Sequence, residues 1–182
     1  MKKLTICVYG AASSNIDDHY IFETEELGRE IGRRGYRLIY GGGATGVMGA
    51  CARGVAETRG EVIGVIPDFM GSYELLNDNC DEMIEARTMG ERKAIMEDRA
   101  DAFIIAPGGI GTLDEFFEIL TLISLDRKSA PVILYNINGY YDILISFIDS
   151  CVQQGFIRNH VKDLFRICDN PAEALDMIEY FA

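Results

Sequence analysis

The chain has 182 residues, 48% of them hydrophobic and 25% charged, which is typical of a globular protein with a sizeable core. Seventeen Lys and Arg against 29 Asp and Glu give a formal charge of −12. This charge argues against a protein that binds nucleic acid or an anionic membrane surface through a basic face. No segment reaches the ~18 consecutive apolar residues of a membrane span, and the N-terminal apolar run is too short for a signal peptide. We expect one domain over residues 1–182.

The cysteines and histidines indicate a cellular compartment and do not form the pattern of a metal site. Five cysteines are odd in number, widely spaced and without a CxxC pair, which favours reduced thiols in a cytoplasmic protein. The two histidines, His19 and His160, are far apart in the sequence and near no cysteine. We therefore expect no metal site built from these residue types.

Strand and helix patterns alternate along the whole chain. The predicted strands are residues 4–9, 37–40, 61–66, 81–85, 103–106, 131–135 and 164–168. The predicted helices are residues 17–34, 47–58, 90–99, 112–125 and 140–154, and Asn170-Pro171 opens a final helix. Residues 68–80 are expected to form a loop that includes a short helical turn. This alternation predicts a Rossmann-like, doubly wound α/β domain, with a mostly parallel sheet covered by helices on both faces.

Two glycine clusters, residues 41–46 and 108–111, each follow a predicted strand. Ligands of such sheets bind at the carboxyl ends of the strands, so both clusters are expected on one rim and in one pocket. The first cluster departs from the G-x-G-x-x-G pattern and follows the second strand, which disfavours NAD binding. A tight turn that needs small residues is the structural alternative. Neither cluster is a P-loop, because no Gly-Lys-Ser/Thr follows.

The second cluster lies in the most informative stretch, Pro107-Gly108-Gly109-Ile110-Gly111-Thr112-Leu113-Asp114-Glu115. A buried strand leads into a turn without side chains, and the turn opens a helix, which together predict a phosphate site. Glu115 has two interpretations. It is either a catalytic carboxylate or the last residue of a Thr112-x-x-Glu115 capping box, and the residues alone leave both open. Arg92-Lys93 alone is most simply a solvated charged pair.

Several blocks together resemble the LONELY GUY (LOG) family of nucleoside 5′-monophosphate phosphoribohydrolases, formerly labelled possible lysine decarboxylases. Residues 107–115 match the signature PGGxGTxxE, and residues 89–93 match the companion Met-x-Glu-Arg-Lys block at the same separation. The similarity also covers the loop of residues 41–49 and the segments 64–67, 138–141 and 155–157. Two departures are Gly90, where the family usually has His, and the turn Tyr9-Gly10-Ala11-Ala12-Ser13-Ser14, which differs from the family's usual Cys-Gly-Ser-Ser type of turn. We expect Gly90 to affect substrate preference or loop flexibility more than the reaction.

The resemblance implies a hydrolase that cleaves AMP or an N6-modified AMP, a cytokinin riboside 5′-monophosphate, to free base and ribose 5-phosphate. Arg92 and Glu115 would be its catalytic pair, and no metal or redox cofactor would be required. The expected substrate-binding residues lie in the matching blocks and in the first glycine cluster: Gly42, Gly43, Glu74, Met89, Lys93, Gly108, Gly109, Ile110, Gly111, Thr112 and Thr121.

Two other functions have been associated with sequences or folds of this kind. Related Rossmann-like proteins include molybdenum-cofactor carriers, so a non-catalytic nucleotide or cofactor carrier is the alternative function. Lysine decarboxylation normally needs pyridoxal phosphate, and no residue is marked as its Schiff-base lysine.

The predicted helix 112–125 is apolar on more than one face. Because family members are commonly dimers, a homodimer is expected.

Overall fold

The computed structural model describes residues 3–70 and 75–181, and its centre is a seven-stranded sheet. All six pairs of neighbouring strands are parallel, in the order β4-β3-β2-β1-β5-β6-β7. The strands are β1 (Thr5–Tyr9), β2 (Arg37–Tyr40), β3 (Glu61–Pro67), β4 (Glu82–Ala86), β5 (Ala102–Ile105), β6 (Val132–Tyr135) and β7 (Arg166–Cys168). The predicted doubly wound α/β fold is confirmed.

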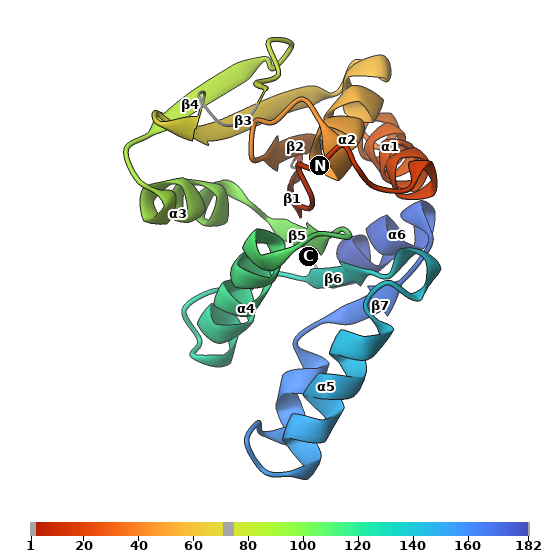
Figure 1. Ribbon diagram of the computed structural model, residues 1–182, viewed down its shortest axis with the longest axis vertical. Coiled ribbons are helices and arrows are strands. Elements are labelled where there is room, and N and C mark those ends of the chain that lie inside the picture. Colours follow the sequence, from red (N-terminus) through yellow and green to blue (C-terminus); the bar gives the residue numbers. More distant parts are fainter. Residues whose placement is uncertain (1–2, 71–74, 182) are drawn as a thin grey trace.

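Helices cover both faces of this sheet, as the buried strands require. They are α1 (Asp18–Arg33), α2 (Gly46–Glu57), α3 (Met89–Arg99), α4 (Ile110–Ser124), α5 (Asp142–Gln153) and α6 (Pro171–Phe181), with short 3-10 turns η2 (Ile137–Gly139) and η3 (Asn159–Asp163). In Figure 1, α5 extends away from the body of the molecule, below the sheet. No described helix is long and apolar enough to cross a membrane.

Two hydrophobic cores lie on opposite faces of the sheet, because alternate strand residues point to opposite sides. On one face, Ile6 and Val8 of β1 pack with apolar residues of α1, α2 and α6. On the other face, Cys7 and Tyr9 of the same strand pack with apolar residues of α3, α4 and α5. The site residues on α3 and α4 therefore belong to the second face.

Most predicted boundaries lie within two residues of the observed ones, and local signals explain why. The side chain of Asp17 accepts the N–H of His19 at the start of α1, and that of Asn170 accepts the N–H groups of Ala172 and Glu173 at the start of α6. One boundary that matters for function differs: α4 begins at Ile110, two residues before the predicted start. The predicted loop 68–80 lies partly outside the described residues.

Candidate active site

The strand order reverses where β1 and β5 lie side by side, which is the place where doubly wound sheets bind their ligands. Strands β2 to β4 follow β1 on one side, and β5 to β7 continue on the other, so the chain segments after β1 and β5 diverge. The glycine turn after β5 leads directly into α4, whose N-cap is Gly109. The first N–H groups of a helix have no partner within it, and here the cap offers no side chain. Their partial positive charge suits this helix start to binding an anion.

Arg92 and Glu115 form a buried ion pair between α3 and α4. The Nη1 of Arg92 donates to Oε1 of Glu115 over 2.8 Å, and both side chains are more than nine-tenths buried. The Nε of Arg92 donates to the carbonyl oxygen of Val65, at 3.2 Å, near the end of β3. The two residues are 23 positions apart in sequence, and the packing of the two helices on one face of the sheet brings them together.

Burial changes the ionisation of this pair. It raises the pKa of the Glu115 carboxyl to about 7, although Arg92 opposes the rise. A buried carboxyl that loses its proton near neutral pH beside a fixed guanidinium is typical of a catalytic group.

The capping-box interpretation of Glu115 is wrong. Thr112 lies inside the first turn of α4 instead of preceding it, because Gly109 is the N-cap and makes no side-chain cap bond. The Glu115 carboxylate accepts a hydrogen bond from Arg92 of α3 instead of turning back to its own helix. A backbone N-cap without a side chain gave no signal in the sequence, whereas the Thr-x-x-Glu spacing gave a misleading one.

Comparison with known proteins identifies the family. Residues 48–178 match the family described as "Possible lysine decarboxylase". The cytokinin riboside 5′-monophosphate phosphoribohydrolases LOG5 and LOG3 of Arabidopsis thaliana are each 36% identical to the chain over 97% of its length. The matches cover 77% and 82% of those proteins. The chain belongs to the LOG family.

Solved structures with the same fold include proteins outside the LOG enzymes. The molybdenum cofactor binding protein of Rippkaea orientalis has a TM-score of 0.74 at 22% identity, covering 99% of this chain and 98% of that one. The molybdenum cofactor carrier protein of Chlamydomonas reinhardtii has a TM-score of 0.73 at 22% identity, with the same coverage. At this identity the likeness shows the LOG fold alone.

The first glycine cluster approaches the pair, as its expected position on the same rim requires. A Cβ on Gly41 would lie 2.2 Å from Nη2 of Arg92, so only glycine leaves room for the guanidinium. Gly41 belongs to the predicted first cluster, although only Gly42 and Gly43 of that cluster were expected to bind substrate. The backbone of Gly42 and Gly43 pairs with a neighbouring segment: the N–H of Asn77 binds the Gly42 carbonyl, and Gly43 bridges to Leu76. Contact of Gly42 and Gly43 with substrate stays a prediction.

Lys93 lies beside the pair but points to α4. Its ammonium group binds Asp114 at 2.9 Å and also binds Glu118. Three carboxylates of α4, including that of Glu115, therefore face Arg92 and Lys93. A role of Lys93 in holding phosphate stays a prediction of the resemblance.

The remaining residues that were expected to bind substrate are more widely spread than the ion pair and its neighbours. Met89 and Ile110 open α3 and α4 and are exposed. Thr121 is also exposed, and its hydroxyl donates to the carbonyl of Phe117. It lies about 9 Å along α4 from Glu115, at ~1.5 Å per residue, so the fold of this chain does not bring it to the ion pair. Glu74 lies outside the described residues. In the part of the chain that the structure describes, no cluster of His, Cys, Asp and Glu is arranged to hold a metal ion.

Proposed function

We propose that this LOG-family protein hydrolyses the N-glycosidic bond of a nucleoside 5′-monophosphate, AMP or an N6-modified AMP such as a cytokinin riboside 5′-monophosphate. The products are the free base and ribose 5-phosphate. The observation that carries the proposal is the buried ion pair between Arg92 of α3 and Glu115 of α4, the helix that the glycine turn opens. LOG5 and LOG3, at 36% identity over nearly the whole chain, bear the name of this activity.

The anion site binds the part of the substrate that does not react. The 5′-phosphate accepts hydrogen bonds from the N–H groups of the glycine turn and the first turn of α4. Phosphate binding fixes the ribose relative to Glu115, so that binding energy away from the reacting bond lowers the barrier at that bond.

The ion pair supplies the groups that bond cleavage needs. When the bond between C1′ and the base nitrogen breaks, its electron pair leaves with the base and positive charge develops on the ribose. The Glu115 carboxylate stabilises that charge and takes a proton from the attacking water, whose oxygen bonds to C1′. Arg92 donates a hydrogen bond to the departing base, which takes up a proton from solvent.

A carrier of nucleotides or cofactors is the second candidate, because solved structures of the same fold bear the names of molybdenum cofactor carriers. Their 22% identity speaks for the fold only, whereas the relatives named as hydrolases reach 36%. Binding of AMP without release of base would favour the carrier.

The test is base release from AMP and N6-isopentenyl-AMP, followed by chromatography. We expect turnover by the wild-type protein and a loss of at least about 100-fold in kcat for Glu115→Gln, the magnitude of one acid–base group. The amide still accepts a hydrogen bond from Arg92, so the melting temperature should change by only a few degrees. Glu97→Gln is the matched control, because Glu97 is also a buried glutamate, on α3, and makes no ion pair with Arg92.

Retention of full activity by Glu115→Gln would contradict the catalytic role of this residue. No base from either substrate with the wild-type protein would contradict the hydrolase itself.

We also propose that the protein is a homodimer located in the cytoplasm. Large apolar side chains on α4, on α5 and just after α5 are exposed to solvent, namely Phe117, Ile143, Phe147 and Phe156. Several large apolar side chains exposed on neighbouring elements are typical of an interface between subunits. Five free cysteines suit a reducing compartment.

A further inference from the structure

Two tyrosine hydroxyls from a later segment of the chain donate hydrogen bonds to the backbone of the glycine turn. The hydroxyl of Tyr141 donates to the carbonyl oxygen of Ala106 over 2.7 Å, and that of Tyr140 donates to the carbonyl oxygen of Gly108 over 2.8 Å. Both tyrosines lie between η2 and α5, more than 30 residues further along the chain. No catalytic step described above uses them.

The other carbonyls of this turn are bound as well. The N–H of Ala11, after β1, donates to the carbonyl of Pro107 at 3.0 Å, and the N–H of Leu113 donates to that of Gly109 at 3.0 Å. Four consecutive carbonyl groups, from residue 106 to residue 109, therefore have protein donors. These donors determine the orientation of each peptide plane in the turn.

The segment that carries the tyrosines is itself rigidly built. The side chain of Asn136 accepts the N–H of Tyr141 at 2.7 Å and donates to the Asp142 carboxylate at 2.8 Å. Asn138 adopts a left-handed conformation with φ of 52°, which asparagine tolerates better than most residues. The ring of Tyr140 packs edge-on against that of Tyr141, with centroids 4.9 Å apart. Its hydroxyl is thus held in place before any ligand binds.

A hydrogen bond that fixes the carbonyl of a peptide unit also fixes the direction of the N–H in the same unit. In a planar trans peptide the C=O and the following N–H point in opposite directions. The carbonyl of Gly108 points to Tyr140, so the N–H of Gly109 points away from Tyr140, on the side where the first N–H groups of α4 begin. No acceptor within residues 3–70 and 75–181 binds that N–H through the backbone.

We propose that Tyr140 is a positioning residue of the anion site, whose hydroxyl holds the Gly108–Gly109 peptide with its N–H directed at the phosphate of the substrate. The inference deepens the proposed function, because it depends on the phosphate lying at this turn. Tyr140 acts through the backbone and does not touch the reacting bond.

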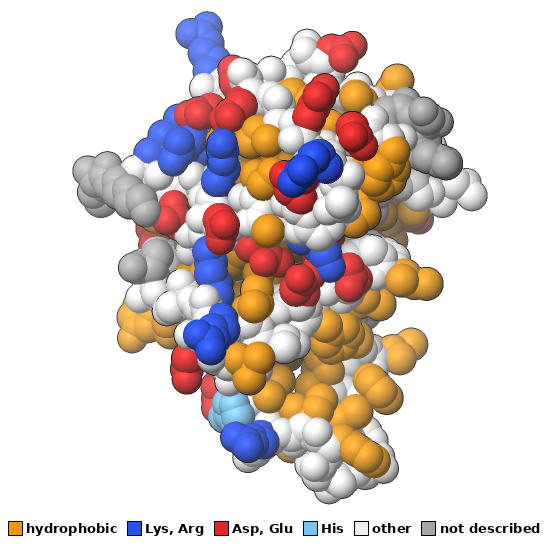
Figure 2. Space-filling view, turned by 90° about the vertical axis from the view of Figure 1, so that its left-hand side faces the viewer, with side chains coloured by type: hydrophobic (Ala, Val, Ile, Leu, Met, Phe, Trp, Pro, Cys, Tyr) orange, Lys and Arg blue, Asp and Glu red, His pale blue; other side chains and the backbone are white. Residues whose placement is uncertain are grey.

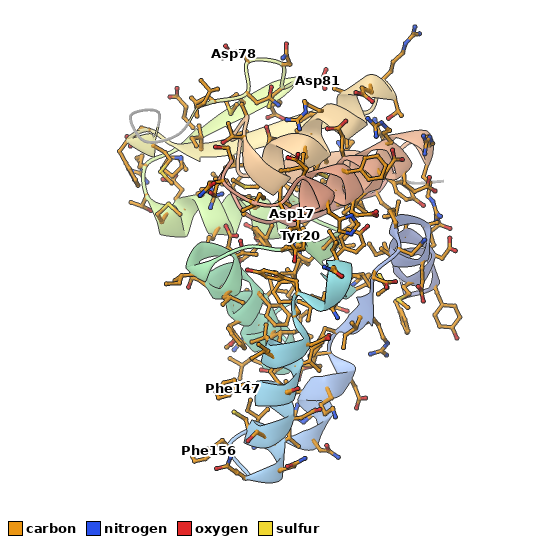
Figure 3. All side chains as sticks on the ribbon, turned by 45° about the vertical axis from the view of Figure 1, so that its right-hand side comes forward. Asp17, Tyr20, Asp78, Asp81, Phe147 and Phe156 are labelled. Carbon is orange, nitrogen blue, oxygen red and sulfur yellow. The ribbon has the colours of Figure 1, made fainter. Side chains whose placement is uncertain are left out.

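A purely structural role of the ring is separable from that of the hydroxyl. The ring of Tyr140 also meets that of Tyr20 of α1, with centroids 5.7 Å apart and the planes at 75°. Figure 3 places Tyr20 next to the turn that precedes α5. Tyr140→Phe keeps both ring contacts and removes the hydrogen bond to Gly108 alone.

The test is calorimetric titration of wild-type protein and Tyr140→Phe with ribose 5-phosphate and, separately, with adenine. We expect the Kd for ribose 5-phosphate to rise about fivefold in Tyr140→Phe, the effect of one neutral hydrogen bond, and the Kd for adenine to stay the same. With AMP as substrate, KM should rise by a similar factor while kcat changes less than twofold.

Tyr36→Phe is the matched control. Tyr36 directly precedes β2 and therefore lies at the opposite rim of the sheet from the glycine turn. Its hydroxyl donates to the Glu179 carboxylate at 2.5 Å. Both Kd values of this variant should therefore equal those of the wild type. An unchanged Kd for ribose 5-phosphate in Tyr140→Phe would overturn the inference, as would an equal loss for both ligands. Because the titration needs no turnover, binding of ribose 5-phosphate without base release would contradict only the proposed hydrolysis.

Discussion

At the scale of single residues, the ion pair of Arg92 and Glu115 is costly to bury, and this points to a function other than stability. Taking both charges out of water costs free energy that their attraction only partly recovers. The raised pKa of Glu115 expresses this imbalance, because desolvation outweighs the stabilising guanidinium. Gly41 leaves the space that the guanidinium needs, at the expense of a side chain in the loop.

The pKa of Glu115 predicts how activity depends on pH. The carboxylate must be ionised to stabilise the charged ribose, so kcat/KM for AMP should rise with pH, with a midpoint near 7. The pKa of Glu115 in the folded protein lies above the value of 4.5 for a free side chain. The protonated carboxyl therefore contributes stability that is lost as the pH rises from 4.5 through about 7. Initial rates of base release between pH 5.5 and 8.5 measure the midpoint.

A second carboxyl supplies the control for this profile. Burial also raises the pKa of Glu97 to about 7. The Glu97→Gln variant should retain the midpoint of the wild-type protein. A midpoint that disappears in this variant would assign the titration to Glu97 and contradict the prediction.

At the scale of elements, close packing of α1 against α2 supports the rim that carries the first glycine cluster. A Cβ on Gly28 of α1 would lie 2.1 Å from the carbonyl oxygen of Cys51, and one on Gly54 of α2 would lie 2.1 Å from that of Glu25. Backbone meets backbone at both positions, so no side chain can move aside. The two helices begin after the loops that follow β1 and β2, and their contact fixes where those loops end.

Gly28→Ala is therefore expected to destabilise the protein by about 2 kcal/mol, since the added methyl group forces the helices apart. Urea unfolding followed by circular dichroism measures the change. The matched control is Gly90→Ala in the first turn of α3, where a Cβ has nothing closer than 3.9 Å. That variant should be neutral or more stable by up to ~1 kcal/mol, because alanine favours helix more than glycine. Equal stability of the two variants would refute the packing argument.

At the scale of the whole molecule, apolar surface is concentrated where α5 extends from the body. Figure 2 shows hydrophobic side chains gathered in its lower right part and charged side chains mainly above and to the left. In Figure 3, Phe147 and Phe156 lie on the same side of α5 and its C-terminal continuation. Their exposed fractions are 61% and 82%, which leaves large aromatic rings in water unless a second subunit covers them.

The proposed dimer predicts that Phe147→Glu is a monomer. A carboxylate in the centre of an apolar interface would have to be desolvated without a partner, which disfavours association. Light scattering at micromolar concentration should give twice the chain mass for the wild-type protein and the chain mass for the variant. Phe22→Glu, at a 57% exposed aromatic on α1, should remain a dimer. A monomeric wild-type protein would contradict the proposal.

The sequence by itself determined the order of strands and helices, the parallel sheet and the rim on which both glycine clusters lie. These features follow from local signals, such as the β-rich run before Pro107 and the Asn170-Pro171 start of α6, and such signals act over a few residues. The family signature also named Arg92 and Glu115, which the fold brings within 2.8 Å.

Only the tertiary structure decided what these residues contact. It showed that Glu115 binds Arg92 instead of capping its own helix, and that Lys93 is bound to carboxylates of α4. It also revealed the hydroxyl of Tyr140 on the glycine turn. Each of these contacts joins segments more than 20 residues apart, and their distance depends on how helices pack on the sheet. Periodicity and spacing along the chain carry no information about that packing.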